Sequence, residues 1–305
     1  MVSLIIPTYN KPERLRITLA SVLNLALDFP LEVVIVNDGS SKDTVAILKT
    51  FEKRARKHEY ITTKIYHITN TGRSSARNYG IRNSNGDLLI FTDDDLVLHQ
   101  NFIKNHLKHH VEKNLVVHGQ IFSLPYLKFF KDPANGKLIN NQKCLGALKN
   151  ALLDYKEIKN NIYESVYRKC RLSKFENDIK SLYLNTTLNE SDVRWIGFVG
   201  GNVSVEKKNL LKVGLFDTML GHQWGCEDLE LGYRLYKEGM TFVYSESAAN
   251  YHIDHYRDNV GELHKEAFKY FFSKHHDLSI ELLYDYFLGK ISDLMQWRNK
   301  IRTEV

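Results

Sequence analysis

The sequence predicts an α/β fold, in which a mostly parallel sheet is flanked by helices. Over residues 2–122, short apolar runs alternate with segments of helical character. The runs are continuously apolar, which indicates strands covered on both faces. The helical segments between them indicate right-handed parallel crossovers. We expect strands at residues 3–6, 33–36, 65–68, 88–91 and 116–122.

Turns separate these elements. Asp38-Gly39-Ser40 follows the second expected strand, and a helix containing Val45, Ile47 and Leu48 comes next. Asn85-Gly86 forms the turn before the fourth strand. We assign residues 1–122 to this α/β half.

The second part of the chain divides into three segments. Residues 123–194 are rich in Lys, Asn and Tyr, and we interpret them as an insertion that is mostly helical, for example over 148–158. The α/β pattern returns over 195–256, with a strand at 195–205 and a helix at 227–238 that Gly239 ends. Residues 257–305 are helical by period, and we expect this extension to pack back onto the core.

Composition is typical of a folded globular protein, with 43% hydrophobic and 26% charged residues. No apolar run has the roughly 18 to 20 residues of a membrane span, and the start of the chain resembles a first strand, so we expect a cytoplasmic protein. Three unpaired cysteines favour reduced thiols. Most of the net charge of +6 lies in the insertion. This segment either forms a solvated surface or contacts something anionic, such as the inner face of a membrane.

Polar side chains follow three of the expected strands. They are Thr8 and Tyr9, then Asp38, then the triplet Asp93, Asp94 and Asp95. In open α/β sheets, ligands bind beyond the carboxyl ends of the strands. Adjacent carboxylates repel unless a cation compensates, and Mg²⁺ or Mn²⁺ binds carboxylates together with phosphates. The triplet therefore favours a divalent metal site that a nucleotide diphosphate would complete.

Four segments resemble the successive signatures of family 2 glycosyltransferases. They are "LIIPTYNKPERLRITLASV", "VVIVNDGSSKDT", "NTGRSSARNYGIRNSNGDLLIFTDDD" and "WGCEDLELGYRL". The resemblance covers roughly residues 2–255 and implies the GT-A fold. It also implies a metal-dependent inverting enzyme that moves a sugar from a nucleotide donor, usually a UDP-sugar, to an acceptor hydroxyl. The insertion would then lie on the acceptor side.

The resemblance also implies roles for the donor-side residues. Thr8 and Tyr9 would line the base pocket, and Asp38 would accept a hydrogen bond from the uracil imide. Arg73 and Arg77 match the segment that contacts the nucleotide, where an arginine suits a diphosphate. In the D-x-D motif, Asp95 would ligate the metal, and Asp93 would contact the metal or the ribose. Asp94 would be a capping or supporting residue.

On the acceptor side, Glu227 and Asp228 form the family's ED motif, and Asp228 matches the general base that takes the acceptor's proton. Gly201 and Asn202 resemble an acceptor-side turn, and Trp224 would stack on an acceptor sugar. His252 matches the last metal ligand of some relatives, with His255 as the alternative. His106, His109 and His110 have the spacing of one helix face, and we expect them to be solvated.

Other interpretations stay open. "WGCED" also resembles the corresponding region of polypeptide N-acetylgalactosaminyltransferases, which retain configuration, although Asp228 and D-x-D favour inversion. A nucleic-acid-binding protein is a weaker alternative, because the aspartates would repel phosphates. Processive synthases carry membrane spans and Q-x-x-R-W, which this chain lacks, so we expect a nonprocessive enzyme. The acceptor could be a glycan, a lipid-linked molecule, a small molecule or a peptide, and peripheral membrane contact could involve the basic insertion or the C-terminal helices.

Overall fold

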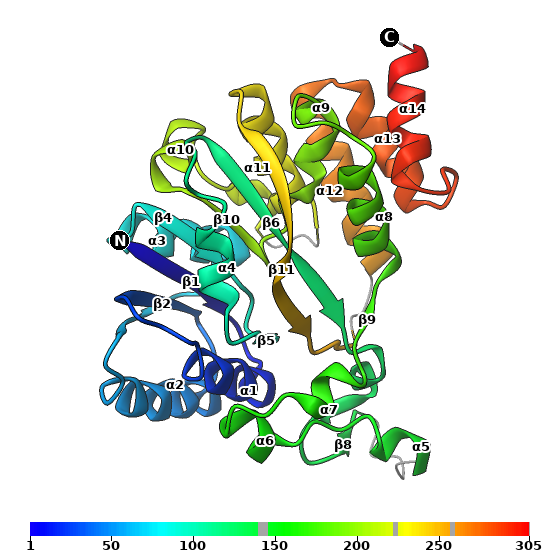
Figure 1. The fold of residues 1–305 in the computed structure, drawn as a ribbon. Coiled ribbons are helices and arrows are strands. Elements are labelled where there is room, and N and C mark those ends of the chain that lie inside the picture. Colours follow the sequence, from blue (N-terminus) through cyan, green and yellow to red (C-terminus); the bar gives the residue numbers. More distant parts are fainter. Residues whose placement is uncertain (140–145, 222–224, 257–259, 305) are drawn as a thin grey trace.

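The protein is described from a computed structural model, which covers residues 1–139, 146–221, 225–256 and 260–304. Within these ranges, nine strands form one twisted sheet with helices on both faces (Figure 1). Across the sheet the strands follow in this order: β3 (Ile61–Ile68), β2 (Leu31–Asp38), β1 (Val2–Thr8), β4 (Leu88–Phe91), β10 (Val203–Glu206), β6 (Leu115–Ser123), β11 (Thr241–His252) and β5 (Leu96–Leu98). Strand β9 (Arg171–Leu172) pairs with β6. The α/β fold predicted from the sequence, a central sheet flanked by helices, is confirmed, although only four of the eight strand pairings that the structure describes in this sheet are parallel.

The N-terminal half is parallel, as its continuously apolar strands predict. Strands β1 (Val2–Thr8) and β2 (Leu31–Asp38) are buried along their whole length. They pair with each other and with β3 (Ile61–Ile68) and β4 (Leu88–Phe91) in parallel register. Helices α1 (Pro12–Val22) and α2 (Lys42–Ala55) share a core with one face, and α3 (Arg73–Asn83) packs on the other.

The other half of the sheet is mixed. Strand β10 (Val203–Glu206) runs antiparallel between β4 and β6 (Leu115–Ser123). Strand β11 (Thr241–His252) is parallel to β6 and antiparallel to β5 (Leu96–Leu98). Helix α4 (Phe102–Leu107) packs against β11. The strand expected at 195–205 is wrong in its first part. Residues Trp195–Gly197 form the short helix η2, because Trp195 is fully buried among helices rather than in a sheet.

The insertion consists mainly of short helices. The expected helix over 148–158 is broken into α5 (Gly146–Lys149) and α6 (Tyr155–Lys159), because Asp154 caps a new helix through its carboxylate. The remaining elements are η1 (Pro125–Phe129), β7 (Phe130–Asp132), β8 (Lys137–Leu138), α7 (Glu164–Tyr167), β9 (Arg171–Leu172), α8 (Lys174–Leu184) and α9 (Ser191–Arg194).

The C-terminal helices pack onto the core, as expected. Trp297 is fully buried, and its ring centroid lies 6.0 Å from that of Trp195. No helix in the described ranges is long and apolar enough to cross a membrane. The helices of this half are α10 (Lys207–Lys212), η3 (Thr218–Leu220), α11 (Glu227–Lys237), α12 (Val260–His275), α13 (Leu278–Phe287) and α14 (Leu294–Glu304).

Candidate active site

The ends of four strands meet at one edge of the sheet. Thr8 ends β1, Asp38 ends β2, the aspartate triplet follows β4, and His252 ends β11. A cavity of about 370 Å³ opens here, lined by Thr8, Tyr9, Lys11, Asp38, Asn70, Arg73 and all three aspartates. The structure therefore brings the residues predicted to bind the nucleotide into one crevice, except Arg77.

Asp38 shapes one wall of this crevice. Its carboxylate accepts hydrogen bonds from the backbone N–H groups of Thr71 and Gly72, at 2.8 and 3.0 Å, and from the side-chain amide of Asn70 at 3.1 Å. Gly72 has φ +90°, and a β-carbon there would lie 2.6 Å from the backbone of Gly221, so the loop requires glycine. Asp38 thus holds the loop that leads into α3, and a bond to a nucleobase would be additional to these.

Asp94 is tied to the first strand and to a lysine. Thr8 donates its hydroxyl to Asp94 at 2.8 Å, and the ammonium group of Lys11 lies 3.1 Å from the other carboxylate oxygen. Burial raises the pKa of Asp94, and Lys11 offsets this only in part. Lys11 also pairs with Asp95 at 2.8 Å. Sequence reasoning missed Lys11, which directly precedes α1 and places its charge beside the acidic cluster.

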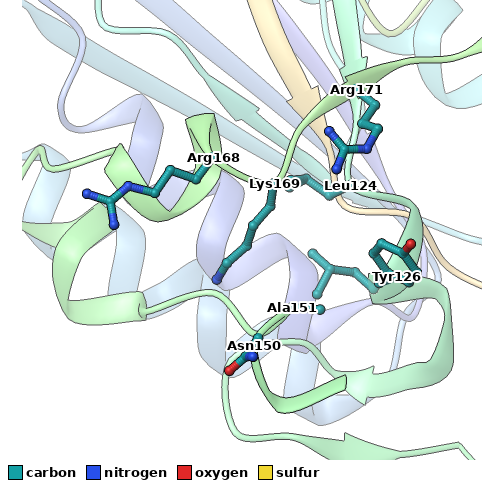
Figure 2. Close-up of a pocket in the computed structure, with 8 residues that line it drawn as sticks. Leu124, Tyr126, Asn150, Ala151, Arg168, Lys169 and Arg171 are labelled. Atoms are coloured by element: carbon teal, nitrogen blue, oxygen red, sulfur yellow. The ribbon is translucent and has the colours of Figure 1, made fainter. Parts of the chain in front are cut away.

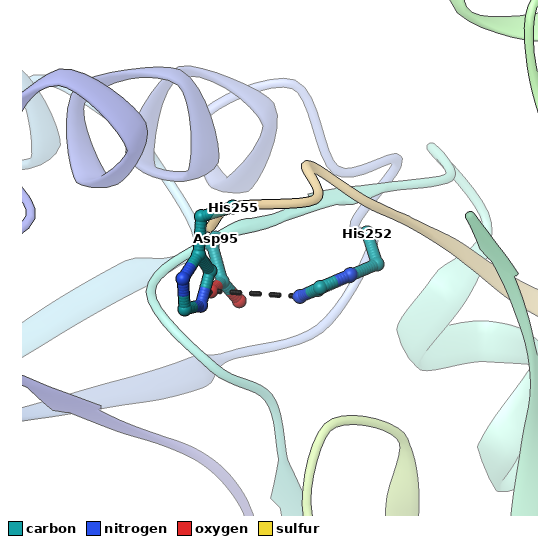
Figure 3. A group of neighbouring side chains, drawn as sticks. All are labelled: Asp95, His252 and His255. Atoms are coloured by element: carbon teal, nitrogen blue, oxygen red, sulfur yellow. Dashed lines mark ion pairs between the residues drawn. The ribbon is translucent and has the colours of Figure 1, made fainter. Parts of the chain in front are cut away.

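Asp95 forms a candidate metal site with two histidines. Its carboxylate lies 3.6 Å from Nε2 of His252 and 3.2 Å from Nε2 of His255 (Figure 3). The ligand atoms of the three residues lie within 4.8 Å of one another. Burial opposes ionisation of Asp95, but Lys11 and His252 outweigh it and hold its pKa well below the usual range. Burial lowers the pKa of His252, yet Asp95 raises it overall to about 9.

The three side chains Asp95, His252 and His255 form a ligand set that fits a transition metal. Imidazole nitrogens suit transition metals, and carboxylates suit Mg²⁺ and Mn²⁺, so a mixed set favours Mn²⁺ over Mg²⁺. Nδ1 of His252 lies 2.6 Å from the Asp254 carboxylate, the kind of outer contact that orients a histidine ligand. Both histidines belong to the group, so the choice between His252 and His255 need not be exclusive.

Arg77 lies behind the cluster rather than in the crevice. Its side chain is fully buried and bonds to three carboxylates: Asp93 at 2.8 Å, Asp228 at 2.9 Å and Glu227 at 3.4 Å. Burial lowers the pKa of Arg77, but these carboxylates outweigh it and raise the pKa overall. Arg77 therefore does not line the crevice in which a nucleotide contact was predicted. Its guanidinium instead joins Asp93 of the D-x-D segment to Glu227 and Asp228 of the ED segment.

Asp228 stands at the start of α11 with one side open to a second cavity. One carboxylate oxygen accepts from Arg77 and the other from the backbone N–H of Gly200 at 3.0 Å. Gly200 permits this approach, since a β-carbon there would lie 2.6 Å from both Arg77 and Asp228. Burial raises the pKa of Asp228 to about 7, despite the opposing charge of Arg77. Such a pKa suits a general base.

Glu227 is buried beside Asp228 and holds Arg73. The Arg73 guanidinium lies 2.7 Å from Oε1 of Glu227, and this carboxylate raises the pKa of Arg73. Arg73 lines both cavities, whereas Glu227 lines only the second. Glu227 therefore positions an arginine that lies between the two cavities.

The second cavity, of about 310 Å³, shares Arg73 and Asp93 with the first and includes Gly201 and Asp228. Asn202 does not face it. Its amide is fully buried and bonds to the carbonyl groups of Gln120 and Ala248 and to the ring of His106. The predicted acceptor-side contact of Asn202 is thus replaced by a structural role. Trp224 lies outside the described residues.

Two further residues support the site and were missed or misjudged. Burial lowers the pKa of His106 to about 3, so the expectation of a solvated His106 is wrong. Arg14 is buried and donates to five backbone carbonyl groups, two of which belong to Ile253 and Asp254 between the histidines. Arg14 lies within the first of the four segments quoted above, and His106 lies in none of them. Only tertiary contacts reveal their roles.

Cys226 precedes the ED pair in a left-handed conformation, with φ +70°. Its side chain is buried, and burial raises the pKa of the thiol well above its usual value. A thiol in this state is not a nucleophile.

A smaller cavity, of about 170 Å³, lies in the insertion and is lined by Tyr126, Asn150, Arg168, Lys169 and Arg171 (Figure 2). Arg168 points away from it and pairs with Glu164 at 2.8 Å. Segment 168–171 carries three of the basic residues of the insertion, Arg168, Lys169 and Arg171. None of them lines the acidic crevice.

Comparisons with known proteins agree with this geometry. The sequence profile described as glycosyl transferase family 2 matches residues 3–169, and a second profile, described as the N-terminal domain of galactosyltransferase, matches 180–257. An uncharacterized glycosyltransferase of Bacillus subtilis is 30% identical over 83% of this chain and 64% of its own length. A chondroitin synthase of Pasteurella multocida is 29% identical over 82% of this chain and 24% of its own.

Solved structures share the fold. A mannosyltransferase of Pyrobaculum calidifontis, in complex with GDP-Man and Mn²⁺, aligns with a TM-score of 0.57 at 16% identity, covering 90% of this chain and 63% of the other. TarS of S. aureus (residues 1–349) aligns with a TM-score of 0.54 at 17% identity, covering 92% and 65%. The chain thus spans between about a quarter and just under two thirds of these proteins. A family profile that matches more than half of the chain decides the assignment: the chain belongs to glycosyl transferase family 2.

Proposed function

We propose that this chain transfers a sugar from a UDP-sugar to an acceptor hydroxyl with inversion at the anomeric carbon, with Asp228 as general base. The observation that supports this most is the arrangement around Arg77. The Arg77 guanidinium pairs with Asp93, which lines the crevice at the strand ends (the donor crevice), and with Asp228, which lines the adjoining second cavity. A base across from the leaving group is what an inverting displacement requires.

The donor crevice suits a nucleotide diphosphate. Lys11 and Arg73 supply positive charge to the pyrophosphate, and Tyr9, half exposed beside Asp38, offers a ring to the base. Asp95, His252 and His255 would hold Mn²⁺, or Mg²⁺ less well. Such an ion, when bound, neutralises the charge of the leaving diphosphate. Among solved relatives of the fold, TarS has been observed with UDP-GlcNAc and the mannosyltransferase with GDP-Man and Mn²⁺.

Asp228 would act on the acceptor. With its pKa near 7, a substantial fraction of the carboxylate is ionised at neutral pH and can accept the acceptor's hydroxyl proton. Relatives named as chondroitin and hyaluronan synthases favour a glycan acceptor. A cytoplasmic location and contact of the basic insertion with a membrane surface stay predictions.

The test is a donor screen followed by product analysis. Thermal unfolding is measured with UDP-sugars and GDP-mannose, with and without Mn²⁺, because a ligand that binds only the folded state raises the midpoint. We expect stabilisation by a UDP-sugar that depends on Mn²⁺, and a product of inverted anomeric configuration by NMR. A retained configuration would contradict Asp228 as base, and stabilisation by nucleic acid instead of nucleotide sugars would contradict the proposal as a whole.

A further inference from the structure

The cavity beside Asp228 has a wall built by segments far apart in the sequence. Phe175 comes from α8 in the insertion, His264 from α12 and Phe287 from α13. The rings of Phe175 and Phe287 are half-buried, with centroids 5.4 Å apart and planes tilted by 47°. The ring of His264 lies 4.9 Å from that of Phe287. Together they form an aromatic surface in the same cavity as the candidate base.

The polar side of the same cavity is negative. Two basic residues line it as well, and both already face carboxylates. Arg73 lies 2.7 Å from Glu227, and His252 lies 2.6 Å from Asp254 and 3.6 Å from Asp95. Burial lowers the pKa of His264, which favours its neutral form. Four carboxylates line the cavity: Asp93, Glu176, Glu227 and Asp228. Three of them share Arg77, which is buried behind the cavity wall, so the carboxylates outnumber the arginines that face them.

Glu176 is fixed in the wall of this cavity. Its carboxylate is buried and lies 2.8 Å from the hydroxyl of Tyr244 and 3.2 Å from Nε2 of His118. Because these contacts hold the carboxylate in place, its negative charge stays in the cavity wall. An acceptor must therefore present hydroxyl or amide groups here rather than a second anion.

We propose that this cavity binds an uncharged sugar as the acceptor, with its ring packed on Phe175 and Phe287 and one hydroxyl directed at Asp228. The inference rests on the proposed function and specifies its substrate class. A pyranose ring suits such a cavity because its C–H groups form an apolar face and its hydroxyls form a polar rim. The volume is at the small end of the roughly 300–1,000 Å³ range of ligand pockets, which suits one terminal sugar residue.

The carboxylates of this cavity also disfavour a negatively charged acceptor sugar. A uronic acid or a sugar phosphate in the reacting position would bring its anion beside Glu176, Glu227 or Asp228. Like charges brought together out of water disfavour binding strongly. Anionic groups on the acceptor, where present, belong outside this cavity.

The experiment uses the full chain with Mg²⁺ and UDP, and titrates methyl glycosides by saturation-transfer difference NMR. The probes are methyl β-glucoside, methyl β-galactoside and methyl N-acetyl-β-glucosaminide, with methyl β-glucuronide as the anionic counterpart. We expect at least one neutral glycoside to bind with saturation strongest on its ring C–H protons. The glucuronide should bind about tenfold more weakly or worse.

Substitutions of Phe175 and Phe287 test whether their rings contact the bound sugar. Phe175→Leu and Phe287→Leu keep the apolar volume but lose the flat ring, and each should weaken binding of the neutral glycoside about tenfold. Phe129→Leu is the matched control, because Phe129 is an exposed aromatic residue of the insertion that does not line this cavity. UDP binding should be unchanged in all three.

Failure of the inference differs from failure of the proposed function. If the chain binds UDP and the metal but no neutral glycoside, or binds the glucuronide more tightly, the inference is overturned and the proposed function stands. Unchanged glycoside binding in both leucine variants also overturns it. If the chain binds no nucleotide with Mg²⁺ or Mn²⁺, the proposed function fails, and the inference fails with it.

Discussion

Replacing Asp228 with Asn tests the proposed base, and the structure predicts opposite effects on activity and stability. The substitution keeps the shape of the side chain but removes the proton acceptor. General-base assistance is typically worth about 10²- to 10⁴-fold, so we expect kcat to fall by that factor. Donor binding should persist, because Asp228 does not line the nucleotide crevice.

Stability should change in the other direction. The pKa of Asp228 is about 7 in the fold, against 3.8 for an ordinary aspartate. Each factor of ten in proton affinity is worth about 1.36 kcal/mol, so keeping this carboxylate ionised in the fold costs up to about 4 kcal/mol. The cost is absent at low pH and grows as pH rises from about 4 through about 7. We expect Asp228→Asn to unfold several degrees higher than wild type at about pH 8, with the gain shrinking toward about pH 4.

Two assays check this pair of effects. Sugar transfer is measured with the donor found in the screen, and the wild-type kcat/KM should rise with pH through about 7 as the base loses its proton. Thermal unfolding is followed by calorimetry across the same pH range. Activity of Asp228→Asn within tenfold of wild type would refute the role of Asp228 as base. A lower unfolding midpoint of this variant at every pH would refute the claim that burial of the Asp228 carboxylate destabilises the fold.

Three further substitutions address the metal site and its support. His252→Ala should weaken Mn²⁺ binding about tenfold or more in calorimetric titration, and wild-type affinity should rise with pH toward about 9, because a proton on His252 competes with the ion. Lys11→Met should raise Mn²⁺ affinity severalfold in the absence of nucleotide, since an ammonium group 2.8 Å from Asp95 then no longer competes. Arg14→Met should lower the unfolding free energy by about 3 kcal/mol or more and weaken Mn²⁺ binding, because buried carbonyl groups beside the histidines lose their donor.

Matched controls separate these effects from general damage. His109→Ala removes a histidine outside the metal group, and should leave Mn²⁺ affinity unchanged. Arg16→Met changes an arginine on the same helix as Arg14 that pairs with Asp132 instead. Equal loss of Mn²⁺ affinity in both arginine variants would contradict the specific role of Arg14, and unchanged affinity in Lys11→Met would contradict competition at Asp95.

The sequence predicts the donor side of the site well, because that side is local. Thr8 and Asp38 end strands, and the aspartate triplet follows one, so the strand ends determine where these residues lie. The continuously apolar sequence of these strands indicates that they are buried. The GT-A fold implied by the motifs is supported by the solved structures that share it.

What could not be predicted depends on long-range contacts. Arg77 belongs to a motif associated with the nucleotide, yet packing turns it toward Glu227 and Asp228, about 150 residues further along the chain. The spacing of His106, His109 and His110 suggests one solvated helix face. However, α4 packs against β11, and the ring of His106 contacts Asn202. No local pattern brings Phe175 and Phe287 together, because α8 and α13 meet only in the folded chain.

The most direct test of the account is an anomalous diffraction measurement on crystals grown with Mn²⁺ and UDP. We predict a manganese peak within coordination distance of the Asp95 carboxylate and His252 that also contacts the UDP diphosphate. A nucleotide bound elsewhere, or a manganese ion away from Asp95, would contradict it.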